Sequence, residues 1–389
     1  GKRTKPTLIV VYLRGGADPL GVVVPFADRN LTRWRPSLAL PGPDGVGPNR
    51  VLPLDDTFGF NPNMSELHAM YERGYCAPIV CVGSPHGTRS HFDAQDFMER
   101  GAPGTKLIST GWLNRYLDAT RKSDDANLRA ISLQPLLPRA MRGKYAVLAK
   151  PDQKAELALA TYEKAYPRGK AKESTAKADV LGEQTRNAIK QFGARTVEQL
   201  RELQNVLEQT PATSVKYPGS TFARQLRDIA KVIKADRGLE VTAVDYGGWD
   251  HHINEGPATG QLGRMLGDVS ASLGAFFEDL GAAGKNVLVL AMSEFGRTVK
   301  ENGNQGTDHG HGGFMLAFGS MLNGKQVYGK WTGLEESQLY EQRDLPVHTD
   351  FRVVFAETLK ALFDYDGIKE GLFPEYTTAS EPLGFMSDA

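Results

Sequence analysis

The chain has little cysteine, no long apolar run and no excess of either charge. Only two of its 389 residues are cysteines, and Cys76 and Cys81 stand too far apart along one extended stretch to form a disulfide, so two buried thiols are predicted. No apolar run reaches about 18 residues, so no transmembrane segment is predicted. Basic and acidic residues both number 46, which argues against a nucleic acid partner and favours a small or neutral one.

Short apolar runs alternate with helical patterns along the chain. The runs are rich in β-branched residues and do not alternate with polar ones, which is typical of strands buried on both faces of a parallel sheet. They cover 7–13, 77–83, 128–133, 239–246, 286–293 and 313–319. Helices are predicted at 64–74, 90–101, 111–120, 152–165, 181–209, 219–235, 260–281 and 350–363. This order predicts an α/β fold with a mostly parallel sheet sandwiched by helices.

The segment 150–218 differs from the rest of the chain. It is rich in alanine, lysine and glutamate and has no strand pattern, so it is predicted to be a helical insertion or cap. Residues 1–389 are therefore interpreted as one α/β domain that carries this insertion.

Histidines and carboxylates gather directly after the predicted strands. Ligands of parallel α/β sheets bind at the carboxyl ends of the strands, so residues in these positions are candidates for a functional site. Imidazole and carboxylate groups at adjacent strand ends suit a metal site with mixed nitrogen and oxygen ligands. The candidates are Asp18, His91, Asp250, His251, His252, Glu294, Arg297, Asp308, His309 and His311.

These segments also have plainer interpretations. The glycine-rich stretch 306–314, "GTDHGHGGF", fits a set of turns whose side chains bond their own backbone, and Arg297 fits a structural ion pair. Asp250 and His252 are stronger candidates, because residues two apart in an extended segment point the same way and could share one cation. His251 would then face the other side and only form hydrogen bonds.

Ser90 lies where a predicted helix begins, and two roles fit that position. As an N-cap it would accept a hydrogen bond from the first helical turn, which is the commoner use. As a nucleophile it would gain from the free N–H groups and positive dipole of the helix N-terminus, which stabilise an anion. Arg89, its neighbour, could then hold a phosphate or sulfate oxygen.

At these residues the sequence resembles a bacterial family catalogued as a domain of unknown function, number fifteen hundred and one. The matching pieces span nearly the whole chain and include "YLRGGADPLGVVVP", "SHFDAQDFMERG", "GGWDHH", "SEFGRTVKENGNQGTDHGHGG" and "VHTDFRVVFAETLKALF". That family is similar in turn to the alkaline phosphatase and sulfatase superfamily, an α/β fold with a binuclear metal site. Many members of the family of unknown function carry twin-arginine export signals, so the resemblance to that family implies a periplasmic or exported protein whose signal has been removed.

The resemblance also implies roles for individual residues. Asp250, His252 and one of His309 and His311 would hold one metal, and Asp18, Ser90 and Glu294 a second. The superfamily often has histidine where this chain has Phe295, so the second site lacks one imidazole, which His91 or His311 could supply. One or two divalent cations are expected, zinc first, with manganese, calcium and magnesium as alternatives. His251 and Asp308 are further candidates.

The activity implied is metal-dependent hydrolysis of a phosphate ester or, with less support, of a sulfate ester. Ser90 would be the nucleophile, and Arg89 or Arg297 would neutralise the remaining ester oxygens. The substrate would be an anionic ester on a small molecule or a glycan. The alternative is a non-catalytic exported protein that uses the pocket to bind anionic glycans or lipids, or for assembly at the cell surface. The sequence does not indicate an oligomeric state.

Overall fold

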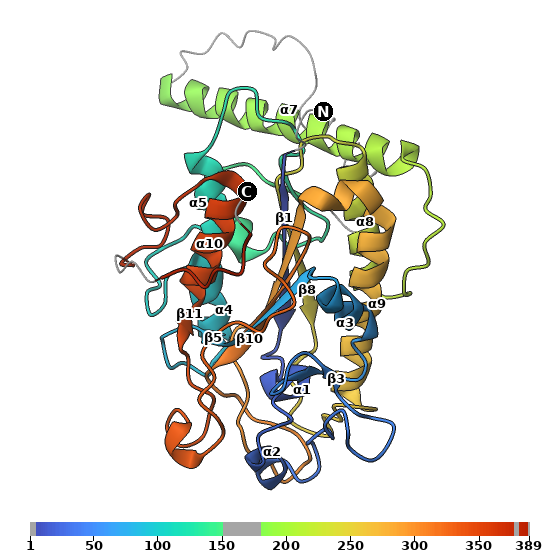
Figure 1. Ribbon diagram of the computed structural model, residues 1–389. Coiled ribbons are helices and arrows are strands. Elements are labelled where there is room, and N and C mark those ends of the chain that lie inside the picture. Colours follow the sequence, from blue (N-terminus) through green and yellow to red (C-terminus); the bar gives the residue numbers. More distant parts are fainter. Residues whose placement is uncertain (1–4, 151–179, 377–380, 388–389) are drawn as a thin grey trace.

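The computed structural model describes residues 5–150, 180–376 and 381–387, and an eight-stranded sheet runs through its centre (Figure 1). From one edge to the other the strands are β11 (Thr349–Asp350), β5 (Cys76–Gly83), β10 (Gly313–Phe318), β9 (Val287–Met292), β1 (Thr7–Arg14), β8 (Val241–Gly247), β6 (Ala130–Ser132) and β7 (Leu148–Ala149). Every pair of neighbours is parallel except the two that involve β10, which runs antiparallel to β5 and to β9. The prediction of a mostly parallel sheet is confirmed, and so are the six predicted strands.

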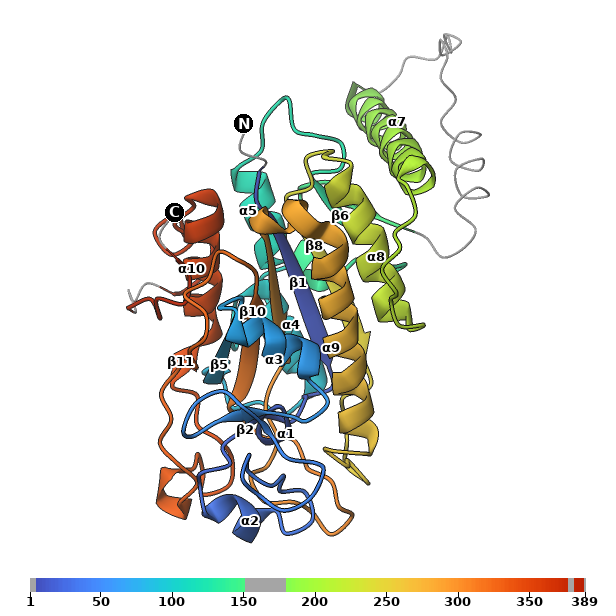
Figure 2. The same cartoon turned by 45° about the vertical axis from the view of Figure 1, so that its right-hand side comes forward.

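Helices cover both faces of this sheet (Figures 1 and 2). On one face lie α3 (Ser65–Glu72), α8 (Thr221–Lys234) and α9 (Gln261–Leu280); on the other lie α4 (His91–Arg100), α5 (Trp112–Ala119) and α10 (Phe351–Phe363). Alternate residues of β1 point to opposite faces. Ile9 and Val11 are buried in the first core and Leu8 and Val10 in the second. Each such side chain contributes about 1.5–3 kcal/mol by leaving water.

The second part of the predicted insertion forms one long helix, α7 (Val180–Gln209), at the amino ends of the parallel strands (Figure 1). Leu200, Leu203 and Val206 of α7 are buried in the first core, so this helix packs on the sheet domain. The helix predicted at 152–165 lies outside the described residues.

Small elements occupy the opposite end, where the parallel strands terminate (Figure 2). They are α1 (Pro19–Val22), α2 (Asn30–Trp34) and a three-stranded antiparallel sheet of β2 (Val23–Val24), β4 (Gly59–Phe60) and β3 (Leu52–Pro53). The sequence did not predict this sheet, because strands of two residues carry no periodic pattern. Short 3₁₀ turns complete the chain at η1 (Arg139–Met141), η2 (Gly281–Asn286) and η3 (Glu336–Gln338).

Two predictions from composition can be compared with the structure. Cys76 and Cys81 are both buried and unbridged, as predicted, and burial raises the pKa of both thiols. Among the described residues, no helix is long and apolar enough to cross a membrane.

Candidate metal centre

Several of the predicted site residues meet at the end of the sheet where the carboxyl ends of the parallel strands lie. Asp250 follows β8, Glu294 follows β9, and His91 begins α4, which is reached from β5. Because β10 runs antiparallel, its first residue lies at this same end of the sheet. The loop that precedes β10 therefore brings His309 close to His91 and Asp250.

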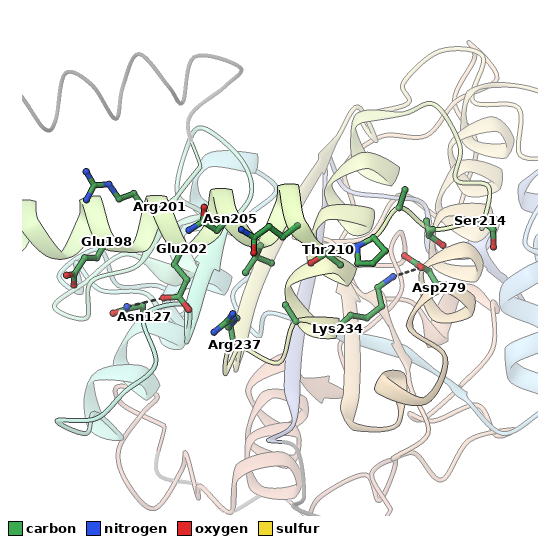
Figure 3. Close-up of a pocket in the computed structure, with 16 residues that line it drawn as sticks. Asn127, Glu198, Arg201, Glu202, Asn205, Thr210, Ser214, Lys234, Arg237 and Asp279 are labelled. Atoms are coloured by element: carbon green, nitrogen blue, oxygen red, sulfur yellow. Dashed lines mark hydrogen bonds and ion pairs between the residues drawn. The ribbon is translucent and has the colours of Figure 1, made fainter.

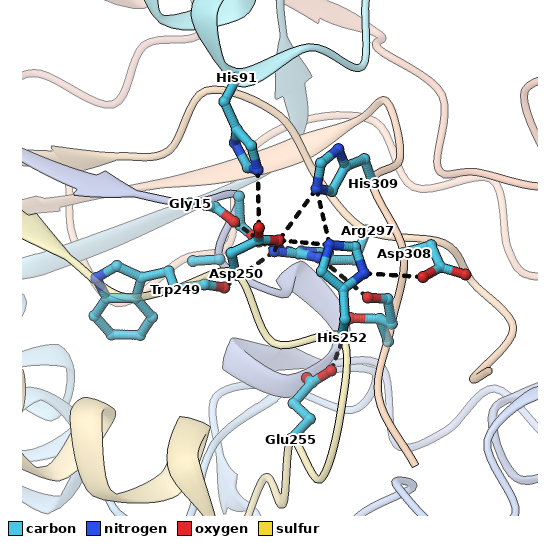
Figure 4. Close-up of polar contacts among 12 residues, drawn as sticks. Gly15, His91, Trp249, Asp250, His252, Glu255, Arg297, Asp308 and His309 are labelled. Atoms are coloured by element: carbon cyan, nitrogen blue, oxygen red, sulfur yellow. Dashed lines mark hydrogen bonds and ion pairs between the residues drawn. The ribbon is translucent and has the colours of Figure 1, made fainter. Parts of the chain in front are cut away.

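Three imidazole rings point their Nε2 atoms at the carboxylate of Asp250 (Figure 4). Oδ1 of Asp250 lies 2.9 Å from Nε2 of His252 and 3.1 Å from Nε2 of His309. Its Oδ2 lies 3.2 Å from Nε2 of His91. We call these four side chains the histidine centre. The Asp250 side chain is 41% exposed, so a ligand could reach its carboxylate from solvent.

The second nitrogen of each ring is held by an oxygen. Carboxylate and carbonyl oxygens accept hydrogen bonds, so each Nδ1 must carry the hydrogen, and the Nε2 of a neutral ring is then a free lone pair. His91 donates from Nδ1 to Glu294 Oε1 at 2.7 Å, and His252 donates from Nδ1 to Asp308 Oδ1 at 2.9 Å. His309 donates from Nδ1 to the Arg89 carbonyl at 2.8 Å.

This arrangement fits a bound transition metal. Nε2 of His252 and Nε2 of His309 lie 3.1 Å apart, and two lone pairs at that distance repel unless a cation or proton lies between or beside them. Nε2 of His91 is buried, and apart from its 3.2 Å contact with Asp250 Oδ2 it has no polar partner among the described residues. Imidazole nitrogens with one carboxylate are typical ligands of zinc and similar ions, and histidine ligands usually donate Nδ1–H to an oxygen that orients the ring. Among the described residues, His91, Asp250 and His309 form one group whose ligand atoms all lie within 4.8 Å of one another.

Charge within the histidine centre favours an ionised carboxylate. Burial opposes ionisation of Asp250, but the hydrogen bond and charge of Arg297, together with His252 and His91, lower its pKa to about 2. The hydrogen bond to Glu294 raises the pKa of His91 above its usual 6.5, although burial opposes this. Burial lowers the pKa of His309, which keeps that ring neutral and able to bind a cation.

Arg297 positions Asp250 and does not face the ligand side. Its side chain is fully buried and donates to Asp250 Oδ1 at 2.6 Å. Its other donors bind the backbone carbonyls of Gly15, Gly16, Thr307 and Trp249. Arg297 was predicted to neutralise ester oxygens, and the structure places its guanidinium, fully buried, against the Asp250 carboxylate and these carbonyls.

Asp18, predicted to bind a metal, lies outside the histidine centre. Its oxygens accept bonds of 2.5 and 2.8 Å from Arg35, and both side chains are 2% exposed. Arg35 also donates to the carbonyls of Val299 and Thr298. Burial opposes ionisation of Asp18, but Arg35 outweighs it and lowers the pKa. The carboxylate therefore serves as the counter-charge of a buried arginine, and the structure brings Asp18 together with Arg35 instead of with the histidine centre.

Glu294 was also predicted as a ligand, but its side chain serves His91. Oε1 accepts hydrogen bonds from His91, from the Gly15 backbone at 2.9 Å and from Gln95 at 2.9 Å, and the side chain is not exposed. Gln95 was not among the residues predicted from the sequence. It stands four residues after His91 on the same face of α4, and that spacing was the available signal.

The two histidines of "GTDHGHGGF" have separate positions. His309 belongs to the histidine centre, whereas His311 is buried against the Tyr340 ring, with ring centroids 4.1 Å apart, and burial lowers its pKa to about 4. His251, predicted to face away from its neighbours, is buried beside Trp249, and burial lowers its pKa to about 4.

The glycines of the same stretch allow it to pack against backbone. A Cβ atom on Gly306 would lie 2.2 Å from the carbonyl oxygen of His252, and one on Gly310 would lie 2.4 Å from the backbone of Arg297. Any other residue would push this loop away from the segments it contacts, so the glycines bring His309 close to Asp250.

Ser90 and Arg89 lie beside the histidine centre, at the start of α4. Ser90 is the exposed N-cap residue, yet its side chain makes no capping hydrogen bond. Nη2 of Arg89 binds Asp344 and Glu341 at 2.6 Å each, and its Nε also donates to Asp344. Its carbonyl, by contrast, holds His309.

A cavity of about 1130 Å³ lies at the other end of the molecule (Figure 3). Its lining includes Asn127 before β6, Arg237 before β8 and Asp279 before β9, so it opens at the amino ends of the strands. Several of its polar groups bind each other, as Lys234 does Asp279 at 2.6 Å. Its position separates it from the histidine centre.

Comparisons with known proteins give a family but no activity. The chain resembles the zinc complex of the C-terminal periplasmic domain of EptC from Escherichia coli (10% identity, 81% of this chain and 73% of the other, TM-score 0.36). It also resembles a protein in the alkaline phosphatase superfamily from Vibrio parahaemolyticus (9%, 81% and 60%, TM-score 0.34) and the alkaline phosphatase from the Antarctic bacterium TAB5 (10%, 81% and 92%, TM-score 0.31).

Likeness at this level concerns the fold alone. A search of curated proteins found no match. The family model described as "Protein of unknown function (DUF1501)" matches residues 47–370, so the chain belongs to that family.

Proposed function

We propose that the protein is a metal-dependent hydrolase of phosphate esters, and less preferably of sulfate esters. The observation that carries the proposal is the convergence of three Nε2 atoms on Asp250 while every Nδ1 is held by a separate oxygen. His91, His252, His309 and Asp250 would hold one divalent cation, with zinc as the first choice. When bound, such a cation polarises an ester oxygen as a Lewis acid.

Ser90 is the proposed nucleophile. Ser90 is exposed, its side chain makes no capping bond, and it directly precedes His91 in the chain, and these features support the role. Attack by Oγ on phosphorus would form a seryl phosphate and break the bond from phosphorus to the substrate oxygen, which would leave as the alcohol with the Ser90 proton. Water would then hydrolyse the seryl phosphate, releasing inorganic phosphate and restoring the hydroxyl. The free N–H groups of the first turn of α4 would stabilise negative charge on the transferred group.

The remaining residues hold the geometry. Arg297 fixes the Asp250 carboxylate, and Glu294 and Asp308 orient His91 and His252 through their Nδ1 atoms. Arg297 and Glu294 are buried, and the half-exposed Asp308 is also bonded to Asn302, so these hydrogen bonds would preorganise the histidine centre before a substrate arrives. We further propose an anionic ester on a small molecule or glycan as substrate and, from the family resemblance, action outside the cytoplasm.

Two helix-start serines allow a matched test. Protein purified without chelator is analysed for metal and assayed with a panel of phospho- and sulfo-esters. About one transition ion per chain is expected, and Ser90→Ala should abolish turnover without changing metal content or stability. Ser220, the N-cap of α8, accepts a real capping bond from Ala223 N at 3.1 Å, so Ser220→Ala should cost about 1 kcal/mol of stability and leave turnover intact.

Each other outcome has a defined meaning. Protein that holds no metal would overturn the proposal. Full activity in Ser90→Ala would remove Ser90 from the mechanism, and metal-loaded protein that hydrolyses no ester would favour a binding protein.

A further inference from the structure

A cavity of about 250 Å³ adjoins the histidine centre on the side of Asp308. Asp308 lines it, and the same carboxylate accepts the Nδ1–H of His252, so an occupant of the cavity would sit one side chain away from the proposed metal ligands. Trp34, Lys300, Gln342 and Arg343 are among its other walls.

The two basic side chains of this cavity, Lys300 and Arg343, have free donors. Lys300 is exposed, and no ion pair or hydrogen bond of its ammonium group occurs within the part of the chain described. The Arg343 side chain is 40% exposed and uses one donor on Asp344 at 3.3 Å and another on the His309 carbonyl at 3.1 Å, which leaves further N–H groups free.

The acidic groups of the lining are bonded in part. Glu301 accepts from the Ser37 backbone and hydroxyl and from the Leu38 backbone, all at 2.8–3.3 Å. Asp308 Oδ1 accepts from His252 and from Asn302, whereas its Oδ2 has no hydrogen bond among the described residues. An incoming anion would therefore meet the free donors of Lys300 and Arg343, with one carboxylate oxygen of Asp308 beside them.

A constrained turn forms one wall of the cavity. Glu341 and Gln342 both have positive φ, 51° and 56°, and Tyr340 and Asp344 close the turn with two backbone hydrogen bonds of 2.8 and 3.0 Å. Two consecutive non-glycine residues in the left-handed region cost about 1–3 kcal/mol each, and such strain clusters at functional sites. The turn carries Gln342 and Arg343 to the cavity, and the Asp344–Arg89 ion pair ties it to the segment before Ser90.

We propose that this cavity is a second anion subsite, which binds another phosphate, sulfate or carboxylate group of the same substrate. Lys300 and the free donors of Arg343 would bind that group, and the Trp34 ring would contact the part of the substrate that links it to the ester. This inference rests on the proposed function, because it takes the histidine centre as the site that binds the ester group. It narrows the substrate class to molecules that carry a second anionic group besides that ester.

The test uses α,ω-alkane bisphosphonates of increasing chain length, whose carbon–phosphorus bonds are not hydrolysed. Their dissociation constants with metal-loaded protein are measured by calorimetry beside alkyl monophosphonates of equal length. One length should bind at least about tenfold more tightly than its monophosphonate, because a charge-assisted contact contributes that much. Lys300→Ala should remove this preference and Lys300→Arg should keep most of it. Lys285→Ala is the matched control, since Lys285 is exposed at the amino end of β9.

The outcomes separate this inference from the proposed function. Equal affinity for both ligand classes at every length would overturn the subsite, and so would an equal loss of preference in Lys285→Ala. A preference that depends on Lys300 in protein that hydrolyses no ester would support the subsite while the hydrolase proposal fails. Ester turnover without any bisphosphonate preference would leave the hydrolase and overturn the subsite.

Discussion

Replacement of Asp18 by asparagine distinguishes the structural role of this residue from the metal-binding role that the sequence suggested. The structure makes Asp18 the counter-charge of Arg35, with both side chains 2% exposed. Asparagine has nearly the same shape but no charge, so Asp18→Asn leaves a buried guanidinium without its carboxylate. We expect the protein to lose stability and to keep its metal.

The size of the loss follows from the contacts. Removing one partner of a buried ion pair typically costs about 3–5 kcal/mol. The lower end applies here, because the asparagine oxygen can still accept one bond and Arg35 keeps its bonds to the carbonyls of Thr298 and Val299. Unfolding entropy of about 2.1 cal/mol/K per residue gives about 0.8 kcal/mol/K for 389 residues, so a loss of about 3 kcal/mol lowers Tm by about 4 °C.

The assay combines calorimetric melting with metal analysis of the same samples. Asp118→Asn is the control, because Asp118 pairs with Arg121 at the surface, where the side chains are 35% and 46% exposed and such pairs contribute about 0–1 kcal/mol. An Asp18→Asn protein that loses its metal but melts like the wild type would refute the structural reasoning and restore Asp18 as a ligand.

Three further predictions concern the histidine centre and its surroundings. His309→Ala should abolish metal binding and His311→Ala should leave it intact, as equilibrium dialysis with zinc would show; the reverse result would contradict the geometry. Glu294→Gln should weaken metal affinity about 10–100-fold by loosening the His91 ring, measured by competition with a chelator, and unchanged affinity would exclude that role. Burial and the Asp18 charge raise the pKa of Glu255 well above 4.5, so the folded protein keeps a proton that the unfolded chain releases. The free energy of unfolding should therefore fall as pH rises above 4.5, by up to about 1.4 kcal/mol per pH unit. Urea denaturation between about pH 5 and pH 8 should show a smaller dependence of this free energy on pH in Glu255→Gln than in the wild type. An unchanged dependence would assign the effect to another group.

Most of the sheet was predictable because its strands are buried on both faces. Continuous apolar runs such as Leu8–Leu13 identify such strands without help from distant residues. Strand direction has no comparable local signal, so the antiparallel course of β10 emerged only from the structure. The direction of β10 matters for function, because a parallel β10 would have placed the loop of His309 at the opposite end of the sheet, beside the amino ends of the parallel strands.

The site was predictable in position and only partly in roles. Asp250, His252 and His309 were identified from their places at strand ends, whereas Asp18 has a strand-end position that suggests the same role. Its partner Arg35 stands 17 residues away along the chain, and no local pattern marks a contact of that kind. Partners of buried charges are set by tertiary structure, so the sequence alone did not show that Asp18 pairs with Arg35.

The supports of the three rings explain why no single motif encodes the histidine centre. The β9–β10 loop supplies Glu294 for His91 at the start of α4 and Asp308 for His252 after β8, and the segment before α4 supplies the Arg89 carbonyl for His309 in the β9–β10 loop. Each ring is thus oriented by a segment other than the one that carries it, and the three rings come from three segments of the chain. Two Nε2 lone pairs held 3.1 Å apart by such bracing are unfavourable in the absence of a cation. A metal that binds there relieves this repulsion only while all three segments are in place, so metal binding and the packing of these loops should stabilise each other.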